Sequence, residues 1–504
     1  MTDTDNKIRP PSPGPRWPRW AVLVVVGLVL VIAAGWGVGT LVRACGGLGS
    51  GVTEIDGECV GVTDGSYVFA PELADVEAKI AEENARVAAS DKRVVTLALL
   101  HPMTANLTSA LSITAVRHAL EGAYTAQYRA NHQQFGDPNP LIRLVLANEG
   151  SHQDQWQPVV QQLAGMVDDE DPLVAVTGLG VSLTQTRLAA DELAALGIPM
   201  VGAIATADEL NYANIRGFLR VVPPNREYIE SLRGYLQRRP ELDSAILVFD
   251  SNSDDPEIPD LFTRSLRDNM REVMSSLIKF PAQSYIGETI PSETTPLLFK
   301  NIVSNICAVQ AQGLKIVLFG GRRADLPYFL TALGERVCLD TPMTVAAAAT
   351  ELGVVKEREA ELRENKITVV YAASTDPPGW GNTVSGTPAN FAEFRSQFDE
   401  LGFDPTRLDG DTLSNHDAVV TAVTAIRLAA TPNSAPTPGD VLGQLLNLNG
   451  PNNSIPGASG QLSFSFRGTQ GDESGNPCDK PIPVLEIAPS VPSAEPEPIY
   501  VTCS

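Results

Sequence analysis

Apolar residues along this chain fall into short, nearly continuous runs that are separated by stretches with helical spacing of apolar positions. From residue 92 onward the runs predict seven buried strands with amphipathic helices between them. This alternation is typical of parallel sheets that are covered by helices on both faces. The predicted strands are 94–100, 142–147, 173–177, 200–204, 245–249, 316–319 and 367–371, and the predicted helices are 111–129, 156–166, 186–196, 226–236, 261–274 and 326–333.

One apolar run is different in kind, because residues 21–42 contain no charged residue. As a helix this run spans roughly 33 Å, about the thickness of the hydrocarbon core of a bilayer. Four bases precede it, whereas Arg43 is the only base between it and Lys79. The charge distribution predicts a cytoplasmic tail at 1–20 and an extracytoplasmic location for everything after the transmembrane helix. The bases are Lys7, Arg9, Arg16 and Arg19.

Two alternatives to a retained anchor remain open at this stage. Residues 42–44 resemble a signal-peptide cleavage site, and the segment ending at Cys45 loosely resembles a lipoprotein box. All three interpretations place the main part of the protein outside the cytoplasm.

The remaining boundaries follow from changes in composition. Residues 43–91 are interpreted as a juxtamembrane segment that includes a polar spacer helix near 71–89. The main domain is expected at 92–487, and a Pro-rich tail is expected at 488–504.

All six cysteines lie at or beyond residue 45, which suits an oxidising compartment. Their spacing favours pairing between neighbours, although six cysteines allow fifteen connectivities. None of these pairs has the CxxC spacing of a zinc or redox site. The predicted disulfides are Cys45–Cys59, Cys307–Cys338 and Cys478–Cys503.

Charge and motifs narrow the possible functions. The net charge of −23 argues against a nucleic-acid-binding role, because phosphates require a basic surface. No nucleophile elbow, P-loop, zinc-protease motif or dinucleotide fingerprint occurs after the apolar run. The sequence therefore predicts a protein that is not an enzyme and that needs no metal or cofactor.

Seven segments, in order, resemble the leucine/isoleucine/valine-binding family of type I periplasmic solute-binding proteins. The resemblance covers about residues 92–487, and its most specific piece is the Gly-Ile-Pro strand with the Ala-Thr-x-x-Glu-Leu loop that follows it. The segments are 94–104 (VVTLALLHPMT), 174–184 (VAVTGLGVSLT), 197–210 (GIPMVGAIATADEL), 218–223 (FLRVVP), 316–321 (IVLFGG), 416–425 (HDAVVTAVTA) and 457–464 (GASGQLSF).

This resemblance implies a two-lobed α/β fold with three crossovers between the lobes. Lobe 1 is expected at about 92–222 and 345–430, and lobe 2 at about 223–344 with part of 431–487. A ligand would be held between the lobes, beyond the carboxyl ends of the parallel strands.

The resemblance also implies site residues on the first lobe. Ser182, in the turn that contains Gly180, falls where the family holds a ligand carboxylate. Ala205 and Thr206 match the loop that supplies a carbonyl and a hydroxyl. The alternative for Ser182 is a second capping residue beside Thr184, the expected N-cap of the following helix, and the alternative for Thr206 is a cap of the turn 208–210. The other two candidates in the first lobe, His101 and Thr104, follow the first strand.

The second lobe departs from the pattern of the amino-acid binders. The loop 251–259 lacks an aromatic residue, and Arg322 and Arg323 stand where an aromatic is common. The amino-acid binders pair the ammonium group of the ligand with a glutamate in the loop that corresponds to 339–344. No glutamate stands there in this chain, and Asp340 is the nearest acid. Arg322 therefore suggests an anionic or polyhydroxylated ligand, although a surface position for either arginine is an alternative.

Together these features predict a membrane-tethered solute-binding protein that captures a small polar molecule, an amino acid or another solute, for an ABC permease. The alternative is a sensor ectodomain or scaffold of the same fold without a transport role.

Overall fold

A computed structural model of the chain describes residues 45–502, and the segments left out within this range follow at the end of this paragraph. The predicted cytoplasmic tail (1–20) and transmembrane helix (21–42) lie outside the described residues. Within the described ranges, no helix is long and apolar enough to span a bilayer. The internal segments left out are 47–48, 107–108, 133–137, 288–297, 349–352, 382–385, 466–473 and 490–498.

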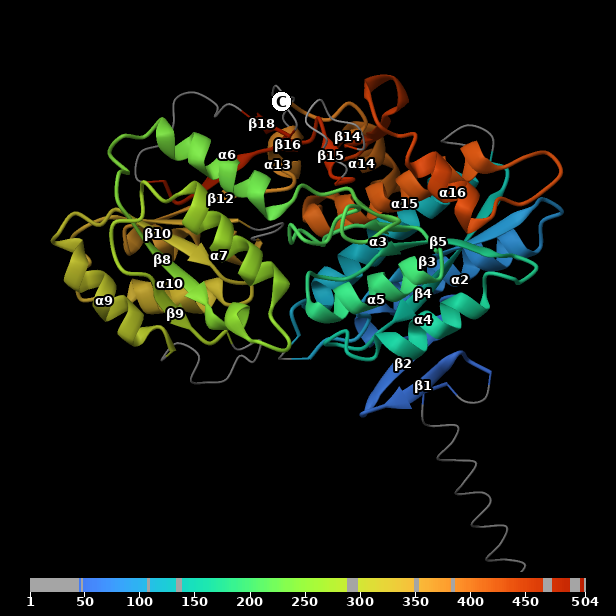
Figure 1. Cartoon of the computed structure of the whole chain (residues 1–504), viewed down its shortest axis with the longest axis horizontal. Coiled ribbons are helices and arrows are strands. Elements are labelled where there is room, and N and C mark those ends of the chain that lie inside the picture. The colour runs from blue at the N-terminus through green and yellow to red at the C-terminus, as the bar shows by residue number, and fades with distance from the viewer. Residues whose placement is uncertain are drawn as a thin grey trace, which may run out of the picture.

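Two lobes lie side by side, each built on its own sheet (Figure 1). The sheet of lobe 1 has the order β1-β2-β4-β3-β5-β6-β7, in which β3 to β7 are parallel and the hairpin β1–β2 is added antiparallel to β4. Its strands are β1 (Val52–Ile55), β2 (Glu58–Thr63), β3 (Val94–Leu100), β4 (Leu141–Asn148), β5 (Leu173–Gly178), β6 (Met200–Gly202) and β7 (Phe218–Arg220).

Helices cover both faces of the first sheet, because its strands are apolar on both sides. Leu97 and Leu99 of β3 pack under α2, α3 and α14 to α16, whereas Ala98 and Leu100 pack under α4 and α5. The helices are α2 (Ala74–Ala88), α3 (Ile113–Asn131), α4 (Trp156–Gly165), α5 (Thr184–Ala195), α14 (Phe391–Glu400), α15 (Gly410–Ala429) and α16 (Pro438–Leu445), with 3-10 turns at η1 (Pro71–Leu73), η3 (Pro405–Arg407) and η4 (Pro451–Asn453).

The sheet of lobe 2 has the order β17-β12-β11-β10-β8-β9, with β17 antiparallel and the others parallel. Helices α6 and α7 cover one face, and α9, α10 and α12 cover the other. Its strands are β8 (Ala245–Asp250), β9 (Gln283–Tyr285), β10 (Ile316–Gly320), β11 (Met343–Ala348), β12 (Ile367–Ala372) and β17 (Val484–Ile487); its helices are α6 (Asn225–Gln237), η2 (Ser251–Asp254), α7 (Leu261–Val273), α9 (Lys300–Gln310), α10 (Leu326–Gly334), α11 (Gly353–Lys356) and α12 (Glu359–Glu364).

The chain passes between the lobes three times, as the two-lobed fold requires. The crossings follow β7, β12 and the small C-terminal sheet. The expected return to lobe 1 at residue 345 is wrong, because β11 pairs with β10 and β12 pairs with β11, so both strands extend the second sheet. The elements between the second and third crossings are α13 (Pro377–Trp380), α14 to α16 and the sheet of β13 (Ile455–Gly457), β14 (Gly460–Phe464) and β15 (Pro477–Cys478).

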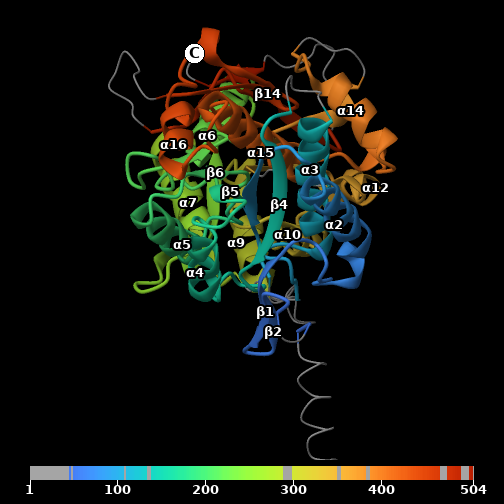
Figure 2. The same ribbon diagram turned by 90° about the vertical axis from the view of Figure 1, so that its right-hand side faces the viewer.

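The described parts of both predicted flanking segments belong to the fold. Helix α2 buries Val76, Ile80 and Val87 in lobe 1, so it is no solvated spacer. At the other end, β18 (Tyr500–Val501) pairs with β16 (Pro481–Ile482). The hairpin β1–β2 projects from the lower end of lobe 1 in both ribbon views (Figure 2).

Two of the predicted disulfides are confirmed, Cys45–Cys59 and Cys307–Cys338. Cys478 is also disulfide-bonded. Its predicted partner, Cys503, lies outside the described residues.

The packing of α15 generates a stability prediction. Ile426 is fully buried against the first sheet, whereas Leu428, two residues later, is 57% exposed. Ile426→Ala should lower the free energy of unfolding by about 2–5 kcal/mol, because it removes buried methyl groups and leaves a cavity. Leu428→Ala, the matched control, should change it by less than about 0.5 kcal/mol. Equilibrium unfolding in urea measures both, and equal effects would contradict the placement of α15.

Candidate functional site

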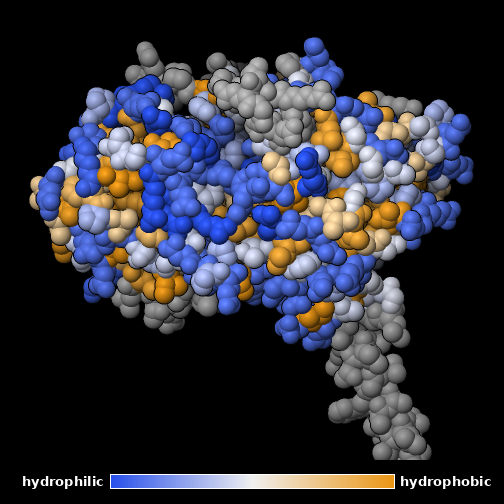
Figure 3. Space-filling model, viewed as in Figure 1, coloured by the Kyte–Doolittle hydropathy of each residue, from blue (hydrophilic) through white to orange (hydrophobic). Residues whose placement is uncertain are grey.

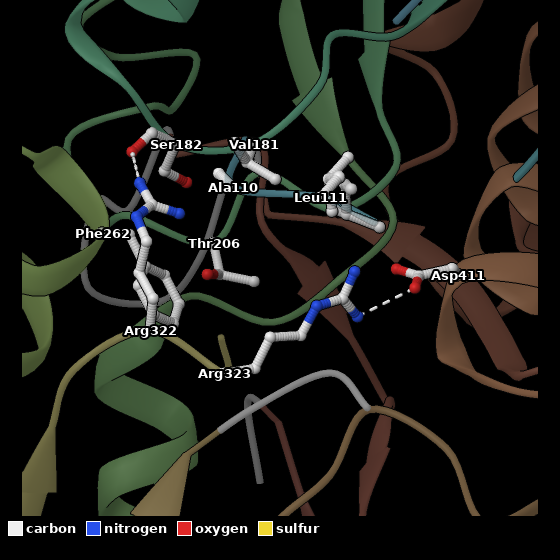
Figure 4. A pocket seen from close by; sticks show the side chains of 10 residues that line it. Ala110, Leu111, Val181, Ser182, Thr206, Phe262, Arg322, Arg323 and Asp411 are labelled. Carbon is white, nitrogen blue, oxygen red and sulfur yellow. Dashed lines mark hydrogen bonds and ion pairs between the residues drawn. The ribbon is translucent and has the colours of Figure 1, made fainter. Parts of the chain in front are cut away.

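A cavity lies between the two lobes, at the carboxyl ends of strands in both sheets. Its volume is about 440 Å³, which includes its open mouth. Hydroxyl, guanidinium and carboxylate groups share its wall with apolar side chains (Figure 4). The lining residues are Ala110, Leu111, Val181, Ser182, Ile204, Thr206, Phe262, Arg322, Arg323 and Asp411.

Ser182 lies in the loop between β5 and α5, and it is 1% exposed. Its Oγ accepts a hydrogen bond of 3.0 Å from the backbone N–H of Ala207, so it ties two cavity loops together. The hydroxyl proton remains available for a ligand acceptor. The N-cap position of α5 belongs to Leu183, so Ser182 does not cap that helix.

Thr206 follows β6, and its side chain projects between the two arginines in Figure 4. The residue is 2% exposed, yet its Oγ1 has no hydrogen-bond partner within the described part of the chain. A buried hydroxyl without a partner costs free energy. A polar ligand in the cavity would remove this cost.

Arg322 enters the cavity from lobe 2, directly after β10 and Gly321. Its Nε and Nη2 donate to the two carboxylate oxygens of Asp260, at 2.6 and 2.9 Å, and Nη2 also donates to the carbonyl of Ser182 at 3.3 Å. The guanidinium lies 5.3 Å from the ring centroid of Phe262. Arg322 is 5% exposed, so the surface alternative for this arginine is wrong.

Arg323 and Asp411 form an ion pair across the two lobes. Nη1 of Arg323, from lobe 2, donates to Oδ2 of Asp411 in the first turn of α15 at 2.8 Å. Burial raises the pKa of Asp411, and the nearby Asp409 adds to this effect while Arg323 opposes it. The second oxygen, Oδ1, is buried without a partner among the described residues. Asp411 therefore offers an acceptor, or a donor when it is protonated, to a ligand.

Four of the predicted site residues lie close to the cavity but not in its wall. The carbonyl of Ala205 accepts from Nη1 of Arg220 at 3.2 Å. His101 is fully buried, and this burial lowers its pKa to about 4, with a further contribution from the charge of Arg323. Thr104 donates to Glu58. Gly180, the fourth residue, lies between β5 and the lining residue Val181.

Gly180 has a structural reason to be glycine. Its φ is +57°, and a Cβ atom there would lie 2.4 Å from Nε2 of Gln153. Gln153 accepts from the N–H of Val181 at 3.1 Å and donates to Glu149 at 2.9 Å. Glu149 and Gln153, which do not line the cavity, thus hold the turn that carries Ser182 in place.

The sequence did not indicate Asp411, Asp260 or Phe262 as site residues. Asp411 opens a helix 88 residues beyond Arg323, and no local motif marks it. The aromatic residue sought in the loop 251–259 is supplied three positions later by Phe262, at the start of α7. Asp340 is exposed and precedes β11, at the end of the strand opposite to the cavity.

Among the described side chains, no cluster of three His, Cys, Asp or Glu residues is arranged to hold a metal ion.

Solved structures share this fold at low sequence identity. The branched-chain amino acid transporter substrate-binding protein LivJ of Streptococcus pneumoniae, in complex with isoleucine, has a TM-score of 0.56 at 13% identity over 81% of this chain and 99% of its own. A branched-chain amino acid ABC transporter protein of Thermus thermophilus with bound valine gives 0.56 at 16% identity, over 81% and 97%. A solute-binding protein of Rhodopseudomonas palustris in complex with 3,4-dihydroxybenzoic acid gives 0.54 at 12%, over 78% and 92%.

These neighbours are substrate-binding proteins of ABC transporters, and the chain has the type I periplasmic binding protein fold that they share. No model of a known protein family matches the sequence, and no curated protein sequence does.

Glu149, behind the Ser182 turn, generates a prediction on pH dependence. Burial raises the pKa of Glu149 to about 8, from its usual value of 4.5. Between these two values the folded protein holds a proton that the unfolded chain has released, so this group makes stability fall as the pH rises. The slope is at most about 1.4 kcal/mol per pH unit. Glu149→Gln should remove this contribution between pH 5 and 8.

Urea unfolding at several pH values measures the slope for the parent and the variant. Glu192→Gln, at an exposed position on α5, is the matched control and should keep the slope of the parent. An unchanged slope in Glu149→Gln would show that Glu149 is ionised in the folded protein.

Proposed function

We propose that this protein is a membrane-tethered, extracytoplasmic solute-binding protein that captures a small polar molecule between its lobes for an ABC permease. The observation that carries the proposal is the cavity whose wall combines residues of both lobes and holds the hydroxyl of Thr206, which has no hydrogen-bond partner among the described residues. A ligand there contacts Ser182 and Thr206 on one side and Arg322 on the other. Binding then favours a closed arrangement of the lobes, because only that arrangement makes both sets of contacts.

The composition of the wall favours a ligand that carries a carboxylate on a small apolar body. The hydroxyls of Ser182 and Thr206 and the guanidinium of Arg322 are donors suited to a carboxylate. Leu111 and Phe262 supply apolar contact. Isoleucine, valine and 3,4-dihydroxybenzoic acid, which three of the structural neighbours hold, all fit this description.

The proposal of a membrane tether is based on the apolar run 21–42 and on the four bases before it. The apolar run is long enough to cross the hydrocarbon core, and the bases favour a cytoplasmic N-terminus. Retention of the full chain in carbonate-washed membranes tests this part of the proposal.

Calorimetry with isoleucine, valine and 3,4-dihydroxybenzoate tests the binding function on a fragment that begins at residue 44. Thermal unfolding with each compound gives a second readout, since a ligand at 100 times its Kd stabilises the folded state by about 2.7 kcal/mol. Binding by none of the three would contradict the proposed ligand chemistry.

Thr206→Val is the sharpest variant for the site, because it removes the hydroxyl and keeps the shape. Loss of a hydrogen bond to a charged ligand group should cost about 1.5–3 kcal/mol, a roughly 10- to 150-fold loss of affinity. The unbound protein should be as stable as the parent or more stable, because the hydroxyl has no partner in the described structure. Affinity by calorimetry and unfolding in urea measure the two effects.

The matched control is Thr331→Val on α10, which does not line the cavity; its hydroxyl donates to the carbonyl of Pro327 and accepts from Arg358. It should leave the affinity unchanged. Parent-like affinity in Thr206→Val would show that Thr206 does not contact the ligand.

A further inference from the structure

The loop between β3 and α3 supplies Ala110 and Leu111 to the cavity wall. Three side-chain bridges lead from the described part of this loop toward the N-terminal hairpin. Thr104 Oγ1 donates directly to Oε2 of Glu58 at 2.7 Å. Asn106 Nδ2 donates to the hydroxyl of Ser151 at 2.9 Å. The N–H of Met103 donates to Oδ1 of Asn148 at 2.8 Å.

Two of these bridges meet at Glu58, the first residue of β2. Its carboxylate accepts from the N–H of Ser151 at 2.7 Å and from the hydroxyl of Ser151 at 2.5 Å, in addition to the bond from Thr104. Partial burial acts to raise the pKa of Glu58, but the hydrogen bonds from Ser151 and Thr104 outweigh it and lower the pKa. The group is therefore a carboxylate that holds the loops after β3 and β4 at one point.

The third bridge ends on the residue next to Glu58. Asn148 Nδ2 donates to the carbonyl of Cys59 at 2.7 Å. Cys59 is also joined to Cys45 by a disulfide. The same short segment is thus fixed covalently to residue 45, by strand pairing to β4, and by hydrogen bonds to the loop that reaches the cavity.

We propose that Glu58 is a positioning residue for the ligand site: it holds residues 101–106 and, through the hydrogen bonds between Asn106 and Ser109, residues 109–111 in the conformation that presents Ala110 and Leu111 to the cavity. The proposal rests on the proposed function in one respect only, since the effect on a ligand requires that a ligand binds there. The hairpin precedes residues 92–487, over which the sequence resembles the solute-binding family. Through the disulfide between Cys59 and Cys45, it also joins the cavity loop to the first residue that the structure describes after the predicted anchor.

Hydrogen exchange with mass spectrometry on the full chain in detergent tests the positioning without any ligand. Glu58→Gln should raise the exchange rate of amides in 101–106 and 149–155 by about tenfold or more, because it weakens charge-assisted hydrogen bonds. The strands β3 and β5 and all of lobe 2 should exchange as in the parent. Glu54→Gln, at an exposed position of the same hairpin, is the matched control and should change nothing.

Thr104→Val keeps the test decisive if Glu58→Gln folds poorly. It should raise exchange in 101–106 alone, and adding it to Glu58→Gln should produce little further increase in that segment. A merely structural role would raise exchange throughout lobe 1, and that result, or unchanged exchange in 101–106, would overturn the proposal.

Calorimetry with isoleucine, valine and 3,4-dihydroxybenzoate is the second arm. A compound that binds the parent should bind Glu58→Gln at least about fivefold more weakly and Glu54→Gln equally well. Parent-like affinity in Glu58→Gln would overturn the positioning role. Failure of the parent to bind any of the three would count against the proposed ligand, and the exchange experiment would still decide whether Glu58 positions the loop.

Discussion

Parallel strands of one sheet all end at the same edge, and this constraint brings the cavity residues together. In lobe 1 the loops after β3, β5 and β6 carry Leu111, Ser182 and Thr206, and in lobe 2 the loop after β10 carries Arg322 and Arg323. The three crossings turn these edges toward each other. Residues that are distant in sequence therefore share one wall without any long loop having to reach across the molecule.

The charges in the cavity are balanced in pairs, and this balance shapes what can bind. Arg322 pairs with Asp260 within lobe 2, and Arg323 pairs with Asp411 across the lobes. A buried ion pair must recover a large desolvation cost, so both arginines are held where their carboxylates lie. The face of the molecule seen in Figure 3 is mainly hydrophilic along the junction of the lobes, with hydrophobic residues scattered over both.

The sequence predicted β3 to β6, β8, β10 and β12, because these strands are nearly continuous apolar runs that are buried on both faces. It missed the hairpin β1–β2, the short strands β7 and β9, and the edge strand β17. It failed at β11, whose residues MTVAAA are small and weakly apolar, and this omission moved the predicted return to lobe 1 too early. Helix α2 was misjudged because its buried face rests on only a few apolar positions, Val76, Ile80 and Val87 among them. Ser182 and Thr206 were predicted from the resemblance to the ligand loops of the family, and Arg322 from a departure from the family's pattern. Asp411 required knowledge of which helix begins opposite Arg323.

The central claim is that a ligand binds between the lobes and changes how they are arranged. Single-molecule energy transfer tests it most directly, with dyes on Leu196→Cys in lobe 1 and Val337→Cys in lobe 2, both at exposed positions. With a compound that calorimetry shows to bind, saturation should shift the population toward one narrow, closed distance, and Thr206→Val should require a correspondingly higher concentration. A distance distribution that stays the same at saturation would contradict the account.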